Sequence, residues 1–213
     1  MTENITVNEQ NSIRIAAGCV IYIDPLNIQD SPHDADIILI THDHYDHFSE
    51  KDIDKVSKPD TLFAAPVSMK ENFGKSGIPD ERITFLKPGE SSEICGVSVK
   101  AVPAYNRMKP FHPKKNGWLG YVLTVSDSVI YVCGDTDDLP ENRNIKCDIL
   151  CVPIGGTFTM DAKQAAEFTN AVKPKSVIPV HYGTLVGKPS DAEKFIGHLT
   201  CGSEVCLKLN FDK

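Results

Sequence analysis

Residues 41–47 read Thr41-His42-Asp43-His44-Tyr45-Asp46-His47, which places three histidines and two aspartates within the last six positions. In an extended segment, side chains two residues apart share a side, so His42, His44 and Asp46 can converge on one point. His47 follows at the turn into a helix that begins at Ser49, and this change of direction can bring it back towards the same region. Neutral imidazole and carboxylate groups are natural ligands for zinc, iron, manganese or nickel. The alternative, a polar loop in which Asp46 caps the helix, has no need of clustered histidines, so the stretch predicts a metal site.

Further polar residues follow two other predicted core strands. The histidine cluster comes directly after the apolar run DIILI, Gly134-Asp135-Thr136 comes after VIYVC, and His181-Tyr182-Gly183-Thr184 comes after SVIPV. Taken alone, Asp135 would be read as a turn residue and His181 as a hydrogen-bonded core histidine. Open α/β sheets, however, commonly gather their sites at the carboxyl ends of strands. The matching placement therefore predicts that Asp135 and His181 share one site with the cluster.

Predicted strands come first in runs and later alternate with helices. We expect a hairpin over 12–24 that turns at Gly18, and strands at 36–41, 97–101, 120–125, 129–133, 148–152, 176–180 and 205–211. Helices are expected to begin at Ser49, between Pro66 and Phe73, at Asp161 with Gln164 three residues later, and at Ser190. This order predicts two mixed sheets packed on each other with helices outside. A doubly wound parallel sheet is the alternative, but it explains the β-rich middle of the chain poorly.

The composition suits a globular enzyme. The chain of 213 residues predicts one domain over 1–213, and 41% hydrophobic residues are enough for a sizeable core. A formal net charge of −7 and a pI near 5.5 argue against general binding to nucleic acid or to a membrane surface. The N-terminal residues contain no charged leader with an apolar run, and the seven cysteines are scattered without a Cys-x-x-Cys. We therefore expect a reduced, cytoplasmic protein, for which a homo-oligomer is compatible with the sequence.

The pattern His42-x-His44-x-Asp46-His47 resembles the H-x-H-x-D-H motif of the metallo-β-lactamase superfamily. Asp24-Pro25, Gly134-Asp135-Thr136 and Val180-His181-Tyr182-Gly183 resemble further landmarks of that superfamily in the expected order, so the resemblance covers nearly the whole chain. It is nearest to the stand-alone metal-dependent hydrolases related to ascorbate-phosphate lactonases, because an additional nuclease or redox domain has no room here. The resemblance implies an α/β fold, a four-layer αββα sandwich of two mixed β-sheets, with a two-metal cleft between the sheets.

The resemblance also implies a set of metal ligands. His42 and His44 would hold one metal, Asp46, His47 and His181 would hold the other, and Asp135 would bridge them. Zinc is the first expectation, with two ions per chain, and manganese, nickel or iron are the alternatives.

The sequence departs from the family pattern at one position. The family usually supplies another histidine to the first metal, after the strand that here ends Val102-Pro103-Ala104-Tyr105, but this chain has Asn106 there. The amide of Asn106 offers only a neutral oxygen, which is a weaker ligand than imidazole. His112 could replace the missing histidine by folding back, or the site could hold one metal only. The sequence leaves both possibilities open.

The segment 106–118 gathers four basic residues in a chain that is acidic overall. Beside a metal cleft, Asn106, Arg107 and Lys109 would contact the phosphate or carboxylate of a small anionic substrate. Phe111 and Trp118 would form an apolar wall. The alternative is a solvated basic loop whose aromatic residues cover the edge of the core.

These features predict a metal-dependent hydrolase in which metal-activated water attacks a small, anionic ester, lactone or phosphoester. Asp46 would orient the water, and His112 or Tyr182 would protonate the leaving group or stabilise the oxyanion. Two other functions stay open, a mononuclear iron oxygenase of the same fold and a non-catalytic metal-binding or anion-binding protein. A serine or cysteine hydrolase is not supported, because the sequence has no Gly-x-Ser-x-Gly elbow and no cysteine within the motif clusters.

Overall fold

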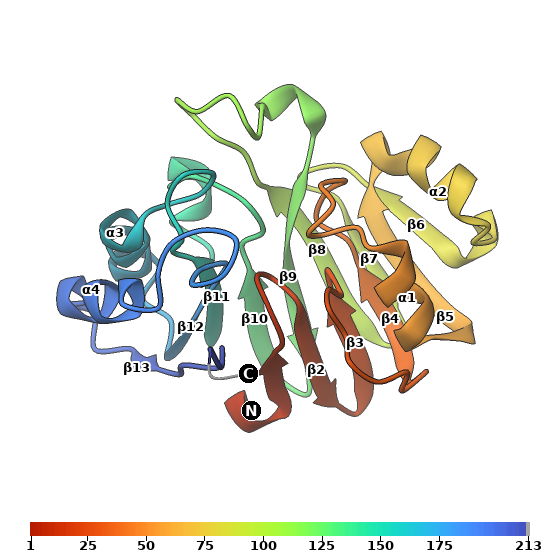
Figure 1. Ribbon diagram of the computed structural model, residues 1–213, viewed down its shortest axis with the longest axis horizontal. Helices are drawn as coiled ribbons and strands as arrows, with labels where there is room; N and C mark the ends of the chain where they lie inside the picture. Colours follow the sequence, from red (N-terminus) through yellow and green to blue (C-terminus); the bar gives the residue numbers. More distant parts are fainter. Residues whose placement is uncertain (212–213) are drawn as a thin grey trace.

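Two β-sheets form the centre of the protein in a computed structural model that describes residues 1–211 (Figure 1). The first sheet holds six strands in sequence order, β1 (Ile5–Val7), β2 (Ile13–Ala17), β3 (Cys19–Ile23), β4 (Ala35–Leu39), β5 (Ser57–Pro66) and β6 (Ile83–Leu86). The second sheet has the order β13-β12-β11-β10-β9-β8-β7 and is built from β7 (Ser91–Ile94), β8 (Val97–Pro103), β9 (Leu119–Val125), β10 (Ser128–Val132), β11 (Ile149–Pro153), β12 (Ser176–Val180) and β13 (Glu204–Val205).

Helices cover the outer face of each sheet. The helices α1 (Glu50–Val56) and α2 (Lys70–Ser76) lie on the first sheet, and α3 (Ala162–Val172) and α4 (Asp191–His198) lie on the second (Figure 1). Short 3-10 turns occur at η1 (Thr2–Asn4), η2 (Val67–Met69), η3 (Asp80–Arg82), η4 (Lys114–Asn116) and η5 (Pro140–Asn142). None of the helices in residues 1–211 combines the length and the apolar character that crossing a membrane requires.

Three apolar cores hold these layers together. The largest lies between the sheets and takes side chains from both, among them Ile15 and Ile21 of the first sheet and Val99 and Leu123 of the second. A second core lies beneath α3 and α4, and a third beneath α1 and α2. The predicted four-layer sandwich is therefore confirmed, and the alternative of a doubly wound parallel sheet is wrong. Both sheets are mixed, because β1–β3 and β7–β10 pair antiparallel, whereas β3–β6 and β10–β13 pair parallel.

Local signals in the sequence account for several elements. The hairpin of β2 and β3 turns at Gly18, whose φ of 83° lies in the left-handed region that favours glycine. The helix α3 begins with the predicted capping box, in which the Asp161 side chain accepts from the Gln164 N–H and the Gln164 side chain accepts from the Asp161 N–H. The predicted helix near Pro66 is α2, which begins four residues later and ends at Ser76, with Gly77 as its C-cap.

The structure differs from the sequence predictions at several elements, and three short strands, β1, β6 and β7, were not predicted. The strand β5 was not predicted, because its first half, Ser-Lys-Pro-Asp, reads as a loop, and only its second half is buried. The predicted strand over 205–211 is wrong, since β13 ends at Val205. Within residues 1–211, β13 pairs with β12 at two positions only. The helix α4 begins directly after Ser190, as predicted, but the Ser190 side chain makes no capping hydrogen bond, and the Asp191 carboxylate instead accepts from the Lys188 N–H at 2.7 Å.

The sheets bring four loops to one edge of the molecule. The strands β8, β10 and β12 run in the same direction within the second sheet, so the segments that follow them leave from the same edge. The segment after β4 joins them across the sandwich, because the Leu119 N–H donates to the Thr41 carbonyl at 3.1 Å and the Tyr121 hydroxyl donates to the Ile40 carbonyl at 2.6 Å. The loop that follows β4 carries the histidine cluster, and this edge therefore positions the candidate site.

Candidate metal centre

The histidines of the cluster lie close enough to share ions. Nε2 of His42 lies 3.1 Å from Nδ1 of His44, and Nε2 of His47 lies 3.3 Å from Nε2 of His181. His42, His47 and His181 are buried, and His44 is half-buried. His42, His44 and His47 follow β4 of the first sheet and His181 follows β12 of the second sheet, so the site spans the gap between the layers.

Three overlapping groups of side chains could hold a metal ion, since the ligand atoms of each group lie within 4.8 Å of one another. They are His42, His44 and His112; His42, His47 and Asp135; and Asp46, His47 and His181. The structure thus brings together all six residues that the sequence predicted as ligands and adds His112 as a seventh.

Asp135 lies between the groups. Its Oδ2 atom is 3.3 Å from Nε2 of His112 and 3.2 Å from Nε2 of His181, and its Oδ1 atom is 3.4 Å from Nε2 of His47. One carboxylate therefore faces histidines of both outer groups, which is the position that a bridging ligand needs.

These atoms fit a divalent metal ion. Nε2 of His112 and Oδ1 of Asp135 are buried without a hydrogen-bond partner, although buried polar groups are usually paired. Two ligands that each bind a tetrahedral ion at about 2.1 Å stand about 3.4 Å apart. Oδ2 of Asp46 is 3.5 Å from Nε2 of both His47 and His181, close to that separation. Imidazole and carboxylate together are a donor set of the kind that zinc and neighbouring metals bind.

The charges at the site are strongly coupled. Burial, together with the nearby His47, lowers the pKa of His42 well below its ordinary value. Burial opposes charge on His47 too, but Asp135 and Asp24 raise its pKa well above the ordinary value. For His181, Asp135 again outweighs burial and raises the pKa to about 9. Burial would raise the pKa of Asp135, but His181 and His47 hold it well below its usual range. The negative charge of the carboxylates that stabilises the protonated imidazoles would also stabilise a bound divalent cation.

Asp24, which follows β3, organises the base of the site. Its buried carboxylate accepts hydrogen bonds from Nδ2 of Asn11 at 2.7 Å, from the Thr41 N–H at 2.8 Å and from the Thr41 hydroxyl at 2.6 Å. Nδ1 of His47 lies 2.7 Å from the same carboxylate, so Nε2 of His47 is directed into the cluster. Carboxylates commonly fix metal-binding histidines in this way. The sequence marked Asp24 only as a family landmark, although it is an acid directly after a buried strand, as Asp135 is.

We expect Asp24→Ala to destabilise the metal-free protein by about 3–5 kcal/mol, because one partner is removed from a buried charged network. Urea denaturation measures this change. The matched control is Asp138→Ala, which removes a partly exposed pair with Arg143 and should change the free energy of unfolding by less than about 1 kcal/mol. Equal effects of the two substitutions would contradict the role assigned to Asp24.

His181 is fixed by close backbone packing. Its N–H donates to the Gln10 carbonyl at 2.9 Å, and its backbone adopts a φ of 54° in the left-handed region. A Cβ atom on Gly155 would lie 2.2 Å from the His181 carbonyl oxygen, so only glycine fits beside it. The loop after β12 is therefore held in one position relative to the loop after β11.

Residues 105–118, which we call the arm, carry His112 into the cluster. Oδ1 of Asn106 accepts from the His112 N–H at 3.1 Å and lies 3.1 Å from Nδ1 of the same histidine. Nδ2 of Asn106 donates to Oδ1 of Asp137 and to the Phe158 carbonyl at 3.1 and 2.8 Å. Both ends of the Asn106 amide are thus engaged within the protein, and Nε2 of His112 points towards Asp135. Of the possibilities that the sequence left open, this geometry supports the one in which the arm folds back.

Trp118 forms a wall of the site. Its ring centroid lies 4.8 Å from those of His42 and His44 and 5.4 Å from that of His112, and the side chain is buried. The predicted apolar wall therefore involves Trp118 directly. Phe111 is partly exposed instead and packs edge-on against Phe158 with centroids 4.7 Å apart.

The structure does not bring Tyr182 to the cluster. Its ring packs in the core beneath α3 and α4 and contacts Phe211 with centroids 5.3 Å apart, whereas the His181 side chain faces Asp135 in the cluster. Lys109 lies in the arm, but its amino group is 3.1 Å from Oδ1 of Asp137 and donates to the Thr159 carbonyl. Arg107 is exposed on the arm.

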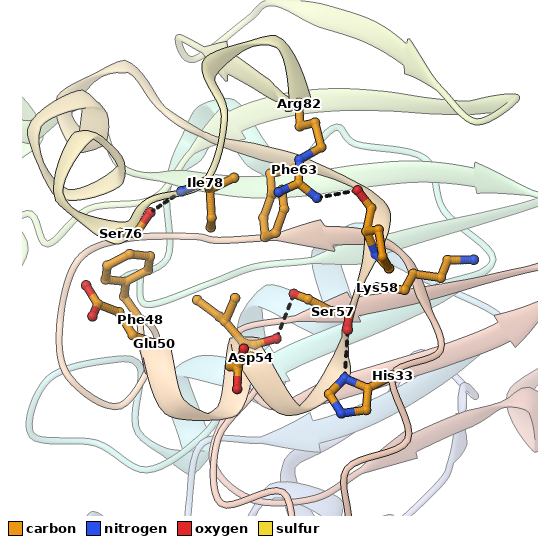
Figure 2. Close-up of a pocket in the computed structure, with 12 residues that line it drawn as sticks. His33, Phe48, Glu50, Asp54, Ser57, Lys58, Phe63, Ser76, Ile78 and Arg82 are labelled. Carbon is orange, nitrogen blue, oxygen red and sulfur yellow. Dashed lines mark hydrogen bonds between the residues drawn. The ribbon is translucent and has the colours of Figure 1, made fainter.

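A hollow of about 350 Å³ lies elsewhere, on the outer side of the first sheet (Figure 2). It is lined by apolar side chains, including Phe48, Phe63 and Ile78, and by Arg82, which donates to the Pro59 carbonyl at 2.7 Å. Acidic and basic side chains both reach its rim, namely Glu50, Asp54, Lys58 and Arg82. The hollow shares no lining residue with the candidate metal centre.

The fold is an αββα sandwich. Its site combines an H-x-H-x-D-H loop, an aspartate between two ligand groups and a further histidine after β12. Together these features define a metal centre of the metallo-β-lactamase type. The sequence profile described as "Beta-lactamase superfamily domain" matches residues 4–181. The chain belongs to the metallo-β-lactamase superfamily, and within it to the stand-alone metal-dependent hydrolases.

Three similar proteins illustrate this placement. A UPF0173 metal-dependent hydrolase of Nitratidesulfovibrio vulgaris is 28% identical over 99% of this chain and 92% of its own length. Another, of Pyrococcus horikoshii, is 31% identical over 76% of this chain and 73% of its own length. A crystal structure from Parabacteroides distasonis, whose name places it among the metal-dependent hydrolases, is 32% identical and superimposes with a TM-score of 0.78, covering 96% of this chain and 91% of that one.

Proposed function

We propose that this chain hydrolyses a small ester, lactone or phosphoester with water activated at a two-metal centre. The observation that carries the proposal is the position of His112, which gives the group of His42 and His44 a third imidazole. With Asp46, His47 and His181 as the other group, each half of the site has three side chains of its own, and Asp135 faces both halves. A binuclear site needs such a complete set of ligands on both sides.

The residues would divide the work as follows. His42, His44 and His112 would hold one divalent ion, Asp46, His47 and His181 the second, and Asp135 would set the spacing between them. A divalent metal bound there supplies Lewis acidity and lowers the pKa of bound water towards about 7. Asp46 is only partly buried and can accept a hydrogen bond from the attacking water, which orients it. In this assignment His112 acts as a ligand and not as a proton donor, and Tyr182 has no part.

Zinc fits the mixed imidazole and carboxylate donors best, with manganese, nickel and iron as alternatives. Support for an anionic substrate comes from Arg107 on the exposed face of the arm. Lys109 contributes less charge to that surface, because it already contacts Asp137. We assign Asn106 to the support of His112 and not to the substrate, since both ends of its amide are engaged.

Elemental analysis of protein purified without added metal or chelator tests the proposal. We expect two divalent ions per chain, and we expect hydrolysis within a panel of a p-nitrophenyl ester, a lactone and a phosphodiester to disappear with chelator and return with metal. One iron per chain together with oxygen consumption would replace the proposal with a mononuclear oxygenase. Two bound ions with tight binding but no turnover of any panel member would indicate a binding protein.

A further inference from the structure

Most of the large apolar side chains that face solvent lie in the segments that carry the candidate metal ligands. Among residues 1–211 the exposed members of this class are Tyr45, Met108, Phe111, Leu185, Ile196 and Leu207. The first four lie in the segments that carry the cluster histidines, namely the loop after β4, the arm and the loop after β12. Met108 is 93% exposed and Tyr45 is 74% exposed. Single exposed apolar residues need no explanation, but several of them in loops that leave from one edge of the sandwich indicate a surface that binds a partner or ligand.

The exposure of Met108 does not come from a loose segment. On either side of it the arm is tied down, because the Arg107 N–H donates to Asp137 at 2.9 Å and the Lys109 amino group contacts Asp137 at 3.1 Å. Further along, the ring of Phe111 packs against Phe158. Figure 1 shows the arm, in green, rising beyond the strand ends at the edge where the ligand loops meet. The protein therefore holds an apolar side chain in solvent on a fixed support.

Much of the basic charge of the arm is offset by nearby acids. Lys109 contacts Asp137, and the Lys114 amino group lies 3.8 Å from Glu141 and stacks on the Tyr105 ring at 4.7 Å. Inside the site, the buried ring of Trp118 continues the apolar surface up to His44. The loops around the metal centre thus present apolar side chains together with the exposed Arg107.

We propose that Tyr45, Met108, Phe111 and Leu185 form an apolar rim that receives an alkyl or aryl group next to the reacting bond of the substrate. This inference rests on the proposed function, and it assigns the substrate to the hydrophobic esters or lactones. Burying a methylene group contributes about 0.8 kcal/mol when it is fully covered, so a partly covered chain of several carbons should bind measurably more tightly than a methyl group.

Binding of alkyl hydroxamates to the zinc-loaded protein, measured by isothermal titration calorimetry, tests the rim without relying on activity. The hydroxamate head engages the metal, and only the chain length differs between acetohydroxamate and octanohydroxamate. We expect octanohydroxamate to bind on the order of ten to a hundred times more tightly than acetohydroxamate. Met108→Ser should remove most of this preference and leave acetohydroxamate binding unchanged. Because the Met108 side chain is highly exposed, this substitution should not impair folding. Leu207→Ser, at a side chain of comparable class that lies outside the ligand loops, is the matched control and should keep the preference.

Equal affinity for both hydroxamates, or the same preference in Met108→Ser and the wild type, would contradict the proposed apolar rim. Neither result would contradict the proposed metal centre. Failure of every hydroxamate to bind the zinc-loaded protein would instead overturn the metal centre, and the rim with it.

Discussion

Replacing Asp135 by alanine is expected to lower kcat/KM for any hydrolysed substrate by on the order of a thousandfold, which corresponds to about 4 kcal/mol of transition-state stabilisation. The reason is its position, since Oδ2 faces both His112 and His181, which belong to different ligand groups, and Oδ1 faces His47. In the proposed two-metal centre, loss of this carboxylate would remove a ligand that both halves share. Elemental analysis should show fewer than two ions per chain, and steady-state kinetics measures the loss of activity.

The control for Asp135→Ala is Asp138→Asn, three residues along the same loop. Asp138 pairs with Arg143 away from the cluster, so this variant should retain both metal and activity. Full activity in Asp135→Ala, or in the parallel variant His42→Ala, would contradict the proposed hydrolytic mechanism.

His112→Ala is expected to lower the metal content from two ions per chain to one, because Nε2 of His112 is the third imidazole of the group with His42 and His44. Asn106→Ala should leave that ligand in place but loosen it, since Oδ1 of Asn106 accepts from the His112 backbone and faces Nδ1 of its ring. We expect a loss of about tenfold to a hundredfold in affinity for the first ion, as is typical when the support of a metal ligand is removed. Competitive titration with a chromogenic chelator measures both effects.

An exposed histidine supplies the control for this series. His198→Ala on α4 should leave the metal content at the wild-type value. Asn106→His should not raise the metal content, because His112 already supplies the imidazole. A rise from one ion in the wild type to two in Asn106→His would show that His112 is not a ligand.

The histidine cluster shows why local sequence was informative about the site. Alternation in an extended chain allowed His42, His44 and Asp46 to converge, and the ends of buried strands located Asp135 and His181. Each of these predictions depends on short-range geometry, which a few neighbouring residues fix. The structure brings them into three overlapping groups, and within each group the ligand atoms lie within 4.8 Å of one another.

The sequence predictions that were wrong or incomplete have a common physical cause. Tyr182 follows His181 directly, but its ring packs beneath α3 and α4, and adjacency in sequence did not reveal which side it would face. The alternating residues after Val205 suggested a strand, yet a strand needs a partner edge, and β12 pairs with only two residues there. Asp24 gained its role only through contacts with Asn11, Thr41 and His47, residues that are separated from it in the chain.

The sequence by itself determined the layered fold, the strand ends that carry the site and six of the seven clustered side chains, because hydrophobic periodicity and ligand spacing are local properties. Tertiary structure alone decided how the site is completed. His112 reaches the centre because the arm folds back and Asn106 holds it, and Met108 becomes exposed because contacts with Asp137 fix the arm around it. Such positions depend on which distant segments meet in space, and no pattern along the chain encodes them.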